Sequence, residues 1–284
     1  MMNQTPYTDS AYHTKPVSIS RLSKTVPSVV FYRYFFPIVW DASRIAQRGM
    51  YDDAAWVKSS IDVFRALERV GVVFHITGMD MLSGLNTPCV IIGNHMSVLE
   101  TAILPGIIQP RRRVTFIVKH SLLSYPIFGS VIRARNPIAV IRTNPRQDLK
   151  TVLEQGTDQL NRGVSIIVFP QTTRVQIFDP GHFNSIGIKL AQRASVPVIP
   201  LALLTDAWKE GPLLSDIGSI DPSKLVHFAF GEPIWIQGRG TDAHQEVIQF
   251  IHQNLMKWQN RIFGGGPNGD RTRVSGVRGQ RPDR

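Results

Sequence analysis

Short β-rich apolar runs alternate with segments of helical periodicity from residue 89 to residue 262, and this alternation constrains the fold more than any other feature of the chain. The predicted strands cover residues 89–93, 114–118, 138–141, 165–169, 198–203 and 225–230. The predicted helices cover residues 97–107, a segment after residue 125, and residues 145–162, 184–194 and 242–262. Strands that alternate with helices in this way favour an α/β fold, in which helices flank a largely parallel central sheet.

Two segments nearer the start of the chain also have helical patterns. Residues 52–70 carry apolar side chains at the spacing of an amphipathic helix. Residues 29–40 are rich in aromatic side chains, but Arg33 and Pro37 interrupt them, and the run is shorter than the ~20 apolar residues that a helix needs to cross a bilayer. With its basic neighbours, this segment predicts either a helix in the plane of a membrane surface or a first helix packed on the core.

These patterns divide the chain into four expected regions. They are a flexible lead at residues 1–27, an N-terminal helical, membrane-associating region at residues 28–72, an α/β domain at residues 73–263 and a disordered basic tail at residues 264–284. The tail has five arginines against two aspartates and no core-forming pattern. It is therefore either a weak attractant for anionic surfaces or a passive extension.

The overall charge is strongly basic. The 284 residues carry a formal net charge of +11, which attracts nucleic acid, an anionic membrane surface or phosphorylated ligands without choosing among them. No helix-turn-helix signal, aromatic RNA-binding motif or zinc-finger spacing accompanies the charge, so no nucleic acid partner is expected. The histidines lack the spacing of metal ligands, which predicts no metal and no cofactor. The single cysteine, Cys89, excludes an intrachain disulfide, and its apolar surroundings predict a buried, inert thiol.

The most informative segment is Gly-Asn-His-Met-Ser-Val-Leu-Glu at residues 93–100, where a predicted strand ends and a predicted helix begins. Ligands of parallel α/β sheets gather at the carboxyl ends of the strands. The Glu100 carboxylate could accept a hydrogen bond from one ring nitrogen of His95, which leaves the other nitrogen to take a proton. Residues five apart diverge on a regular helix, so the pair can meet only if His95 precedes the helix and Glu100 lies in its first turn.

A purely structural explanation competes with this one. Ser97 and Glu100 also have the spacing of a capping box, in which both side chains bond to the backbone of the first helical turn. His95 would then be an ordinary loop histidine. The two explanations can hold together, because a capping Glu100 would lie close to His95.

Two other predicted strands end in cationic segments. Val-Phe-Pro-Gln-Thr-Thr-Arg at residues 168–174 and Ile-Arg-Thr-Asn-Pro-Arg at residues 141–146 each follow a β-rich run. A guanidinium group at a strand end can hold a phosphate through two parallel hydrogen bonds, whereas most exposed arginines are simply solvated. Arg142 and Arg174 are therefore candidate phosphate ligands.

Taken together, these segments resemble four sequence blocks of the lysophospholipid acyltransferase superfamily, typified by 1-acylglycerol-3-phosphate acyltransferases. The family's Asn-His-x-Ser-x-x-Asp block is similar to residues 94–100, and its Phe-Pro-Glu-Gly-Thr-Arg block is similar to residues 169–174. Its glycine followed downstream by an arginine is similar to Gly129 and Arg142, and Val-Pro-x-x-Pro is similar to residues 196–200. Each block is a weak pattern, but four in family order, spread between residues 78 and 231, are specific.

The resemblance implies an activity and a set of site residues. Fatty acyl groups would pass directly from acyl-CoA or acyl carrier protein, as co-substrate, to the hydroxyl of a lysophospholipid acceptor. The expected catalytic residues are His95 and Glu100, and the expected substrate-binding residues are Gly129, Arg142, Gln171, Thr172, Thr173 and Arg174. A second histidine, His120, is expected to be structural. The protein is expected to be peripheral or monotopic on the cytoplasmic face of a membrane.

The chain departs from the family pattern at three positions. Glu100 stands where the family usually has aspartate, Gln171 where it has glutamate and Thr172 where it has glycine. The carboxylate survives, so the catalytic pair is little affected, but the change at residues 171–172 leaves the acceptor open. The alternatives are a different lipid acceptor, such as a lyso-aminolipid or a sugar lipid, or a non-enzymatic basic peripheral membrane or nucleic-acid-binding protein.

Overall fold

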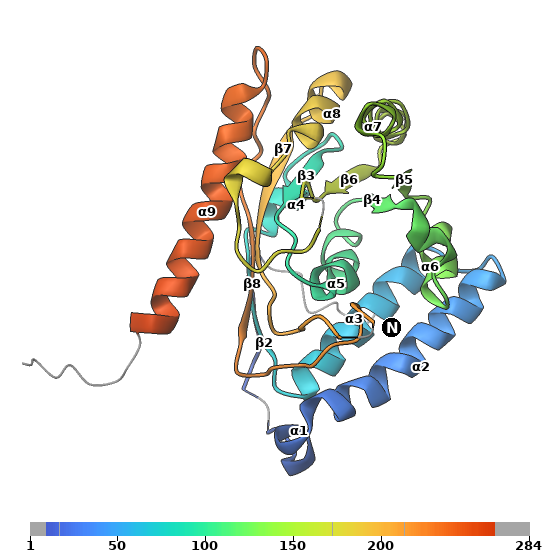
Figure 1. Cartoon of the computed structure of the whole chain (residues 1–284), viewed down its shortest axis with the longest axis vertical. Coiled ribbons are helices and arrows are strands. Elements are labelled where there is room, and N and C mark those ends of the chain that lie inside the picture. Colours follow the sequence, from blue (N-terminus) through green and yellow to red (C-terminus); the bar gives the residue numbers. More distant parts are fainter. Residues whose placement is uncertain (1–9, 17, 172, 213, 265–284) are drawn as a thin grey trace, which may run out of the picture.

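The computed structural model describes residues 10–16, 18–171, 173–212 and 214–264. In these residues, helices pack on both faces of a central β-sheet to form a layered α/β domain (Figure 1). The described strands are β1 (Tyr12–His13), β2 (Val73–Thr77), β3 (Val90–Gly93), β4 (Val114–Lys119), β5 (Ile138–Val140), β6 (Ser165–Val168), β7 (Val198–Leu204) and β8 (Leu225–Phe230). The described α-helices are α1 (Arg21–Thr25), α2 (Pro27–Gln47), α3 (Asp53–Arg69), α4 (Asp80–Ser83), α5 (Val98–Ile108), α6 (Phe128–Ala134), α7 (Pro145–Asn161), α8 (Ile186–Ala194) and α9 (Thr241–Gly264). Two short 3-10 helices are η1 (His120–Ser124) and η2 (Pro180–His182).

The described strands form one eight-stranded sheet in the order β1-β2-β8-β7-β3-β6-β4-β5. The contiguous strands β7, β3, β6, β4 and β5 are mutually parallel, as are β2 and β8. The β7–β8 and β1–β2 pairs are antiparallel. The predicted α/β class with a largely parallel sheet flanked by helices is therefore confirmed.

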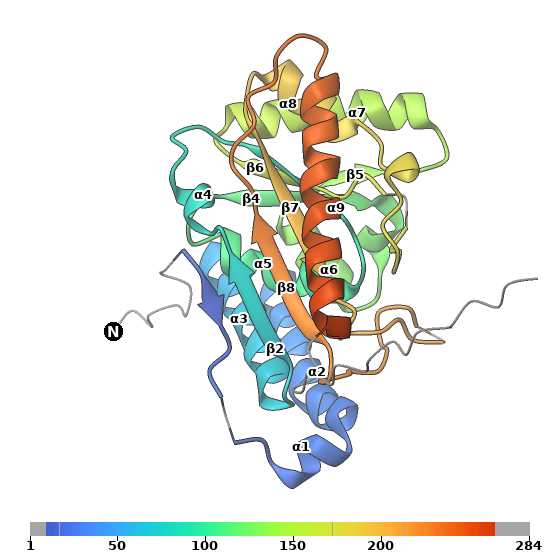
Figure 2. The same ribbon diagram turned by 90° about the vertical axis from the view of Figure 1, so that its left-hand side faces the viewer.

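The pleat of the central strands decides which helices cover which face. Alternate side chains of a strand point to opposite faces. Ile91, Ile167 and Ile199 pack in one cluster with α2, α3 and α5, whereas their neighbours Val90, Ile166 and Val198 pack in another with α7, α8 and α9. Figure 2 shows α9 lying across β7 and β8. Both faces are buried, which explains why these strands are continuous apolar runs rather than alternating ones.

The parallel register of five adjacent strands places their carboxyl ends at one edge of the sheet. The residues that follow β7, β3 and β6 therefore lie beside one another, and those that end β4 and follow β5 continue the same edge. This edge holds the segments that contain His95, Arg142 and Arg174. The order and direction of the strands thus place three of the four sequence blocks at the same edge of the sheet.

The beginning of the chain differs from the expected flexible lead in its described part. Residues 1–9 and 17 lie outside the described residues, but β1 pairs with β2, and α1 precedes α2 directly. The Tyr12 hydroxyl and the Thr14 hydroxyl donate to the Glu68 carboxylate of α3 at 2.8 and 2.6 Å. The described residues 10–16 and 18–27 thus contain regular structure that is bonded to residues distant in the sequence, while the division of the chain into four regions stays a prediction. Of the predicted tail at residues 264–284, Gly264 ends α9, and residues 265–284 lie outside the described residues.

Helix α2 contains the aromatic segment 29–40, and its two sides differ. Phe31 and Phe35 are buried and stack edge-on against the buried Trp208, so one side packs on the core as the second alternative predicts. Phe36 and Trp40, on the other side, are 48% and 57% exposed. Within the described part of the chain, no helix has both the length and the apolar character to cross a bilayer. Membrane association of this region stays a prediction.

Helices α3 and α5 meet through a hydroxyl group inserted at the backbone of α5. The Ser60 hydroxyl donates to the Ala102 carbonyl and accepts from the Gly106 N–H, each at 2.8 Å. Pro105 precedes Gly106 and lacks a backbone N–H, so the helical ladder of α5 is already interrupted there. A Cβ on Gly106 would lie 3.0 Å from the Ser60 oxygen, so the small residue permits the close approach.

Replacing Ser60 by alanine should lower the free energy of unfolding by ~1–3 kcal/mol, because two buried backbone groups lose a partner. Urea denaturation followed by circular dichroism measures this change. Ser124→Ala, which removes an exposed hydroxyl with a local bond to Ser121, is the matched control and should change stability little. Equal stability of Ser60→Ala and the control would show that the α5 ladder closes without the hydroxyl.

Candidate active site

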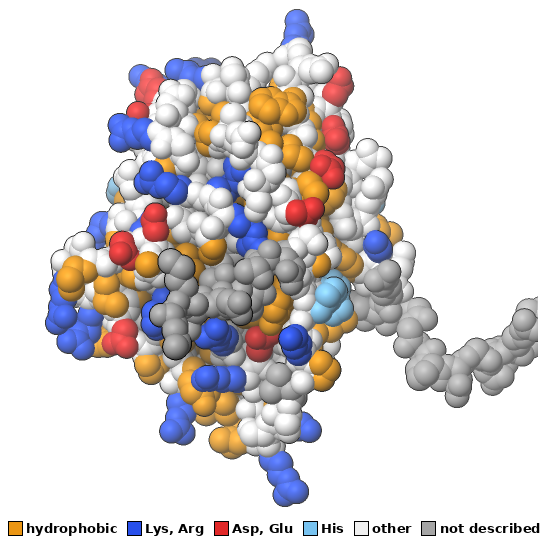
Figure 3. Space-filling view, turned by 180° about the vertical axis from the view of Figure 1, so that it is seen from behind, with side chains coloured by type: hydrophobic (Ala, Val, Ile, Leu, Met, Phe, Trp, Pro, Cys, Tyr) orange, Lys and Arg blue, Asp and Glu red, His pale blue; other side chains and the backbone are white. Residues whose placement is uncertain are grey.

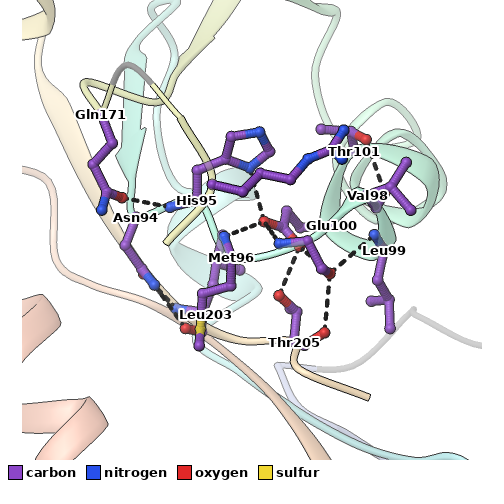
Figure 4. A network of polar contacts seen from close by, with 12 residues as sticks. Asn94, His95, Met96, Val98, Leu99, Glu100, Thr101, Gln171, Leu203 and Thr205 are labelled. Carbon is purple, nitrogen blue, oxygen red and sulfur yellow. Dashed lines mark hydrogen bonds and ion pairs between the residues drawn. The ribbon is translucent and has the colours of Figure 1, made fainter. Parts of the chain in front are cut away.

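His95 and Glu100 form a bonded pair at the carboxyl end of β3. His95 lies in the loop between β3 and α5, and Glu100 is in the first turn of α5, the arrangement that the spacing of five requires. The His95 Nδ1 atom lies 2.8 Å from Glu100 Oε1 (Figure 4). Figure 4 also shows the second ring nitrogen on the side away from Glu100. The pair therefore has the geometry of a general base whose tautomer is set by a carboxylate.

The capping box is present at the same time. The backbone N–H groups of Met96 and Ser97 donate to Glu100 Oε1 at 2.7 and 2.8 Å, and the Ser97 hydroxyl accepts from the Leu99 N–H. Glu100 therefore both caps α5 and orients His95. Both predicted sets of contacts are present, because one carboxylate oxygen accepts from the helix start and from the imidazole together, and the catalytic role of the pair stays a prediction.

The Glu100 carboxylate is completely buried yet stays acidic. Burial pushes its pKa up, but the hydrogen bond and charge of His95, the Thr205 hydroxyl and the Ser97 N–H together hold the pKa below its usual value. A folded-state pKa below the unfolded one means that the ionised carboxylate contributes stability above the unfolded pKa. That contribution is lost as the pH falls through the folded-state pKa.

The main chain of His95 is held from both sides by the segment that follows β6. Gln171 Oε1 accepts from the His95 N–H at 2.7 Å, and the His95 carbonyl accepts from the Val175 N–H at 2.9 Å. The His95 ring stacks on Phe169, with centroids 4.5 Å apart and planes 9° apart. The first and third sequence blocks thus form one unit. Gln171, expected to bind substrate, contacts the backbone of His95 directly.

A cavity of about 610 Å³ opens beside His95. At the sheet edge it is lined by His95 and by the cations Lys119, Arg142, Arg174 and Lys189. Away from that edge, it runs between α2, α3, α5, α6 and β4, where its lining is mainly apolar. The cavity therefore joins a cationic compartment to an apolar one, with the imidazole at its wall.

Arg174 lies in the cavity wall but is already paired. Its Nη2 atom lies 2.7 Å from Asp216 Oδ1, and its Nη1 atom lies 3.7 Å from Glu210 Oε1. Both carboxylates come from the connection between β7 and β8, which the sequence blocks do not include. The charge of Arg174 is therefore shared with the protein itself.

Arg142 follows β5 and has an unusual backbone. Its φ of +64° is in the left-handed region, and its N–H and that of Ile141 donate to the Asp148 carboxylate at 2.8 and 2.9 Å. Burial lowers the pKa of the Arg142 guanidinium, and the nearby Asp148 charge works in the opposite direction. Asp148 thus fixes the turn that directs Arg142 toward the cavity.

Two other expected substrate-binding residues, Gly129 and Thr173, are absent from the described cavity lining. A Cβ on Gly129 would lie 2.5 Å from the Leu123 carbonyl, so this glycine allows α6 to approach η1 and is absent from the described cavity lining. Thr173 is exposed and is also absent from that lining. Thr172 lies outside the described residues. His120 is exposed in η1, away from the described lining.

The sequence did not indicate four residues of this site. Lys119 and Lys189 add cations to the cavity, Asp216 pairs with Arg174, and Thr205 donates to Glu100 at 2.6 Å. The position of Lys119 at the end of a predicted strand was a usable signal. Lys189, Asp216 and Thr205 lie on segments that come close to His95 only because of the order of the strands in the sheet. Among the described residues, no group of three or more histidine, cysteine or acidic side chains could hold a metal ion, and the expectation of no metal stays a prediction.

A histidine bonded to a carboxylate beside a cavity with cationic and apolar parts is an arrangement found in enzymes that activate a hydroxyl group by general-base catalysis. Comparisons with known proteins agree with this class. The sequence model of the Acyltransferase family matches residues 73–204. A 1-acyl-sn-glycerol-3-phosphate acyltransferase of Pseudomonas aeruginosa is 33% identical over 194 residues, which cover 68% of this chain and 71% of that protein. A probable 1-acyl-sn-glycerol-3-phosphate acyltransferase of Mycoplasma pneumoniae is 32% identical over 117 residues, or 40% of this chain and 43% of that one.

The fold has a solved counterpart. The crystal structure of the 1-acyl-sn-glycerophosphate (LPA) acyltransferase PlsC from Thermotoga maritima matches 82% of this chain and 95% of its own, with a TM-score of 0.60 and 18% identity. The chain belongs to the 1-acyl-sn-glycerol-3-phosphate acyltransferase family and is an O-acyltransferase.

Replacing Glu100 by glutamine should lower kcat by ~10²–10⁴, because the amide carries no negative charge to stabilise the imidazolium and offers one acceptor oxygen where the carboxylate offers two. The free energy of unfolding should also fall, by ~1–3 kcal/mol, because the carboxylate caps α5. Ser97→Ala is the control, since it removes the capping bond from Leu99 and the hydroxyl contact with Glu100 Oε2 but keeps the His95–Glu100 contact. If Ser97→Ala reduced the turnover of the folded protein as much as Glu100→Gln does, helix capping alone would explain the loss.

Proposed function

We propose that this acyltransferase moves a fatty acyl group from a thioester to the free hydroxyl of a lysophosphatidate-like acceptor. The single observation that carries the proposal is the His95–Glu100 pair opening onto a cavity that is cationic at one end and apolar at the other. The acceptor hydroxyl attacks the thioester carbonyl while His95 Nε2 takes its proton. The C–S bond then breaks, and the thiolate leaves with that proton. Glu100 accepts from Nδ1–H throughout and stabilises the imidazolium.

The apolar arm of the cavity supports a long acyl chain as part of the substrate. Aromatic rings follow one another from the catalytic centre: Phe169 is 4.5 Å from the His95 ring, Phe116 is 6.3 Å from Phe169, and Trp56 is 6.1 Å from Phe116. Arg135 lies over the Trp56 ring at 4.5 Å and bonds to Asp53 of α3. An apolar chain that extends along these rings would be removed from water over much of its length.

The cationic compartment supports a phosphate on the acceptor. Arg142 and Lys189 line it, and Arg174 lines it with a charge that Asp216 partly satisfies. An Arg and a Lys that converge on one cavity suit a phosphate ester, and holding it there would position the adjacent hydroxyl. The carboxylates Asp216 and Glu210 near Arg174 favour, as a second candidate, an acceptor whose head group also carries an amine.

The purified protein should convert 1-acylglycerol-3-phosphate to phosphatidate with acyl-CoA or acyl carrier protein as donor, as measured by mass spectrometry of the lipid products. A panel that adds a lyso-aminolipid and a sugar lysolipid, with each donor in turn, separates the possible acceptors and donors. His95→Ala should lower the rate by ~10²–10⁴, because the general base is lost. His120→Ala is the matched control and should leave the rate unchanged. Absence of turnover with every donor and acceptor would refute the proposal.

We further propose that the α2 side of the molecule docks on an anionic membrane surface from the cytoplasmic side. An apolar groove of about 660 Å³ lies between α2, the η1–α6 turn and the β7–β8 connection. Phe36, Trp40, Ile127 and Leu214 line it with 44–57% of their surfaces exposed. Val39, Tyr125 and Phe128 line both this groove and the catalytic cavity, so a lysolipid could pass between them. Exposed aromatic side chains of this kind suit a membrane interface.

The basic charge alone gives less support to a nucleic-acid-binding function. On the face seen in Figure 3, lysine and arginine side chains are interspersed with acidic ones rather than gathered in one tract. A continuous basic stripe is the usual footprint of a nucleic-acid-binding surface.

Replacing Trp40 by alanine should weaken partition onto vesicles of phosphatidylglycerol and phosphatidylcholine by ~10-fold, because a large ring no longer inserts. Co-sedimentation with the vesicles measures the effect. Trp235→Ala is the matched control, since Trp235 is 56% exposed but lies between β8 and α9, outside the groove. Equal binding of the two variants would exclude the α2 groove as the docking surface.

A further inference from the structure

The Glu100 carboxylate lacks the partner that usually accompanies a buried charge. It is completely buried, and within the described part of the chain no lysine or arginine forms an ion pair with it. Its oxygens accept instead from neutral donors and from His95. Since an uncompensated buried charge is costly, each of these donors bears on where the carboxylate lies and whether it stays ionised.

Thr205, which is 105 residues from Glu100 in the sequence, donates a hydrogen bond to the second carboxylate oxygen of Glu100. It follows β7, its side chain is fully buried, and its Oγ1 lies 2.6 Å from Glu100 Oε2 (Figure 4). The other oxygen near Oε2 is Ser97 Oγ, at 2.9 Å, which also lies 2.9 Å from the Thr205 carbonyl. One hydroxyl proton cannot serve both acceptors, so Thr205 is the donor committed to Oε2.

The position of Thr205 is itself fixed by the sheet. Asn94, the residue before His95, donates to the Leu203 carbonyl and accepts from the Leu203 N–H, each at 2.8 Å. These two bonds lock the end of β3 to the end of β7. Because side chains two residues apart point to the same side of an extended chain, the lock at Leu203 sets the direction of Thr205. The residue that precedes His95 therefore also fixes the position of Thr205, which donates to Glu100.

We infer that Thr205 is a positioning residue of the acyl transfer, whose hydroxyl holds Glu100 in the rotamer that orients His95. The inference rests on the proposed role of His95 as the base. It also explains how the chain uses glutamate where its family usually has aspartate. The longer side chain places Oε1 on His95 and the start of α5 while Oε2 reaches β7.

The test compares Thr205→Val, which keeps the shape and removes the hydroxyl, with Thr205→Ser, which restores it. Thr205→Val should lower kcat roughly ten-fold and leave the KM of both substrates within about two-fold, because the residue acts on the base and not on the substrates. Thr205→Ser should recover most of the lost rate. Thr157→Val, which removes a helix hydroxyl bonded to Leu153 in α7, is the control and should leave kcat unchanged.

The pH profile separates positioning from simple packing. His95 is the titratable side chain bonded to Glu100, and the remaining donors are the Met96 and Ser97 N–H groups and the two hydroxyls. Loss of the Thr205 donor should raise the pKa of Glu100, so the rate of Thr205→Val should fall at a higher pH on the acid side than that of the wild type. An unshifted acid limb with reduced stability would identify Thr205 as a packing residue and overturn the inference.

A double-mutant cycle completes the test. If Thr205 acts through the carboxylate, Thr205→Val should have little further effect on kcat in a Glu100→Gln background. Independent, multiplying losses would contradict the inference. An inactive wild type would instead refute the proposed function, whereas an active wild type that tolerates Thr205→Val would refute only the role of Thr205.

Discussion

The active site depends on one buried carboxylate. Glu100 has no exposed surface, and it is held by backbone N–H groups at the start of α5, by His95 and by the Thr205 hydroxyl. A charge in such a place is tolerated only when its hydrogen-bonding capacity is filled. The same bonds that satisfy the charge also fix the helix start, the tautomer of His95 and the contact with β7. A change to this carboxylate is therefore expected to affect both the start of α5 and the orientation of His95.

The parallel strands bring the other residues of the site close to that carboxylate. Because β7, β3, β6, β4 and β5 are adjacent and run in one direction, their ends bring Thr205, His95, Gln171 and Arg142 to one edge of the sheet. The helices on one face leave an apolar space that is continuous with this edge. An amphiphilic substrate would meet cations at the strand ends and apolar side chains between the helices. The reacting hydroxyl would lie between these two regions, beside the imidazole.

The departures from the family pattern have physical consequences. The extra methylene of Glu100 is compatible with a bond to Thr205, which follows the neighbouring strand β7. Gln171 accepts from the backbone of His95, a role that needs only an acceptor oxygen and that glutamine fills without adding a charge. Arg174 shares its charge with Asp216, so the cationic compartment is less positive than its arginines and lysines alone would make it. These departures concern the segment expected to bind the head group of the acceptor, so the head group is the part of the substrate that we most expect to differ from that of the family.

The sequence by itself determined the fold class and predicted the contact between His95 and Glu100. Its apolar runs predicted the six strands from β3 to β8, because strands buried on both faces must be continuously apolar. His95 and Glu100 were predictable because their contact is local, spanning one loop and one helical turn. The sequence did not predict four short elements, namely β1, β2, α1 and α4. Segments this short contain too few residues to show a recognisable hydrophobic periodicity. Only the tertiary structure decided that Thr205 bonds to Glu100, that Asp216 pairs with Arg174 and that Gly129 serves packing. The bonds of Thr205 and Asp216 join segments far apart in the chain, and their geometry follows from strand order and register, which local patterns do not encode.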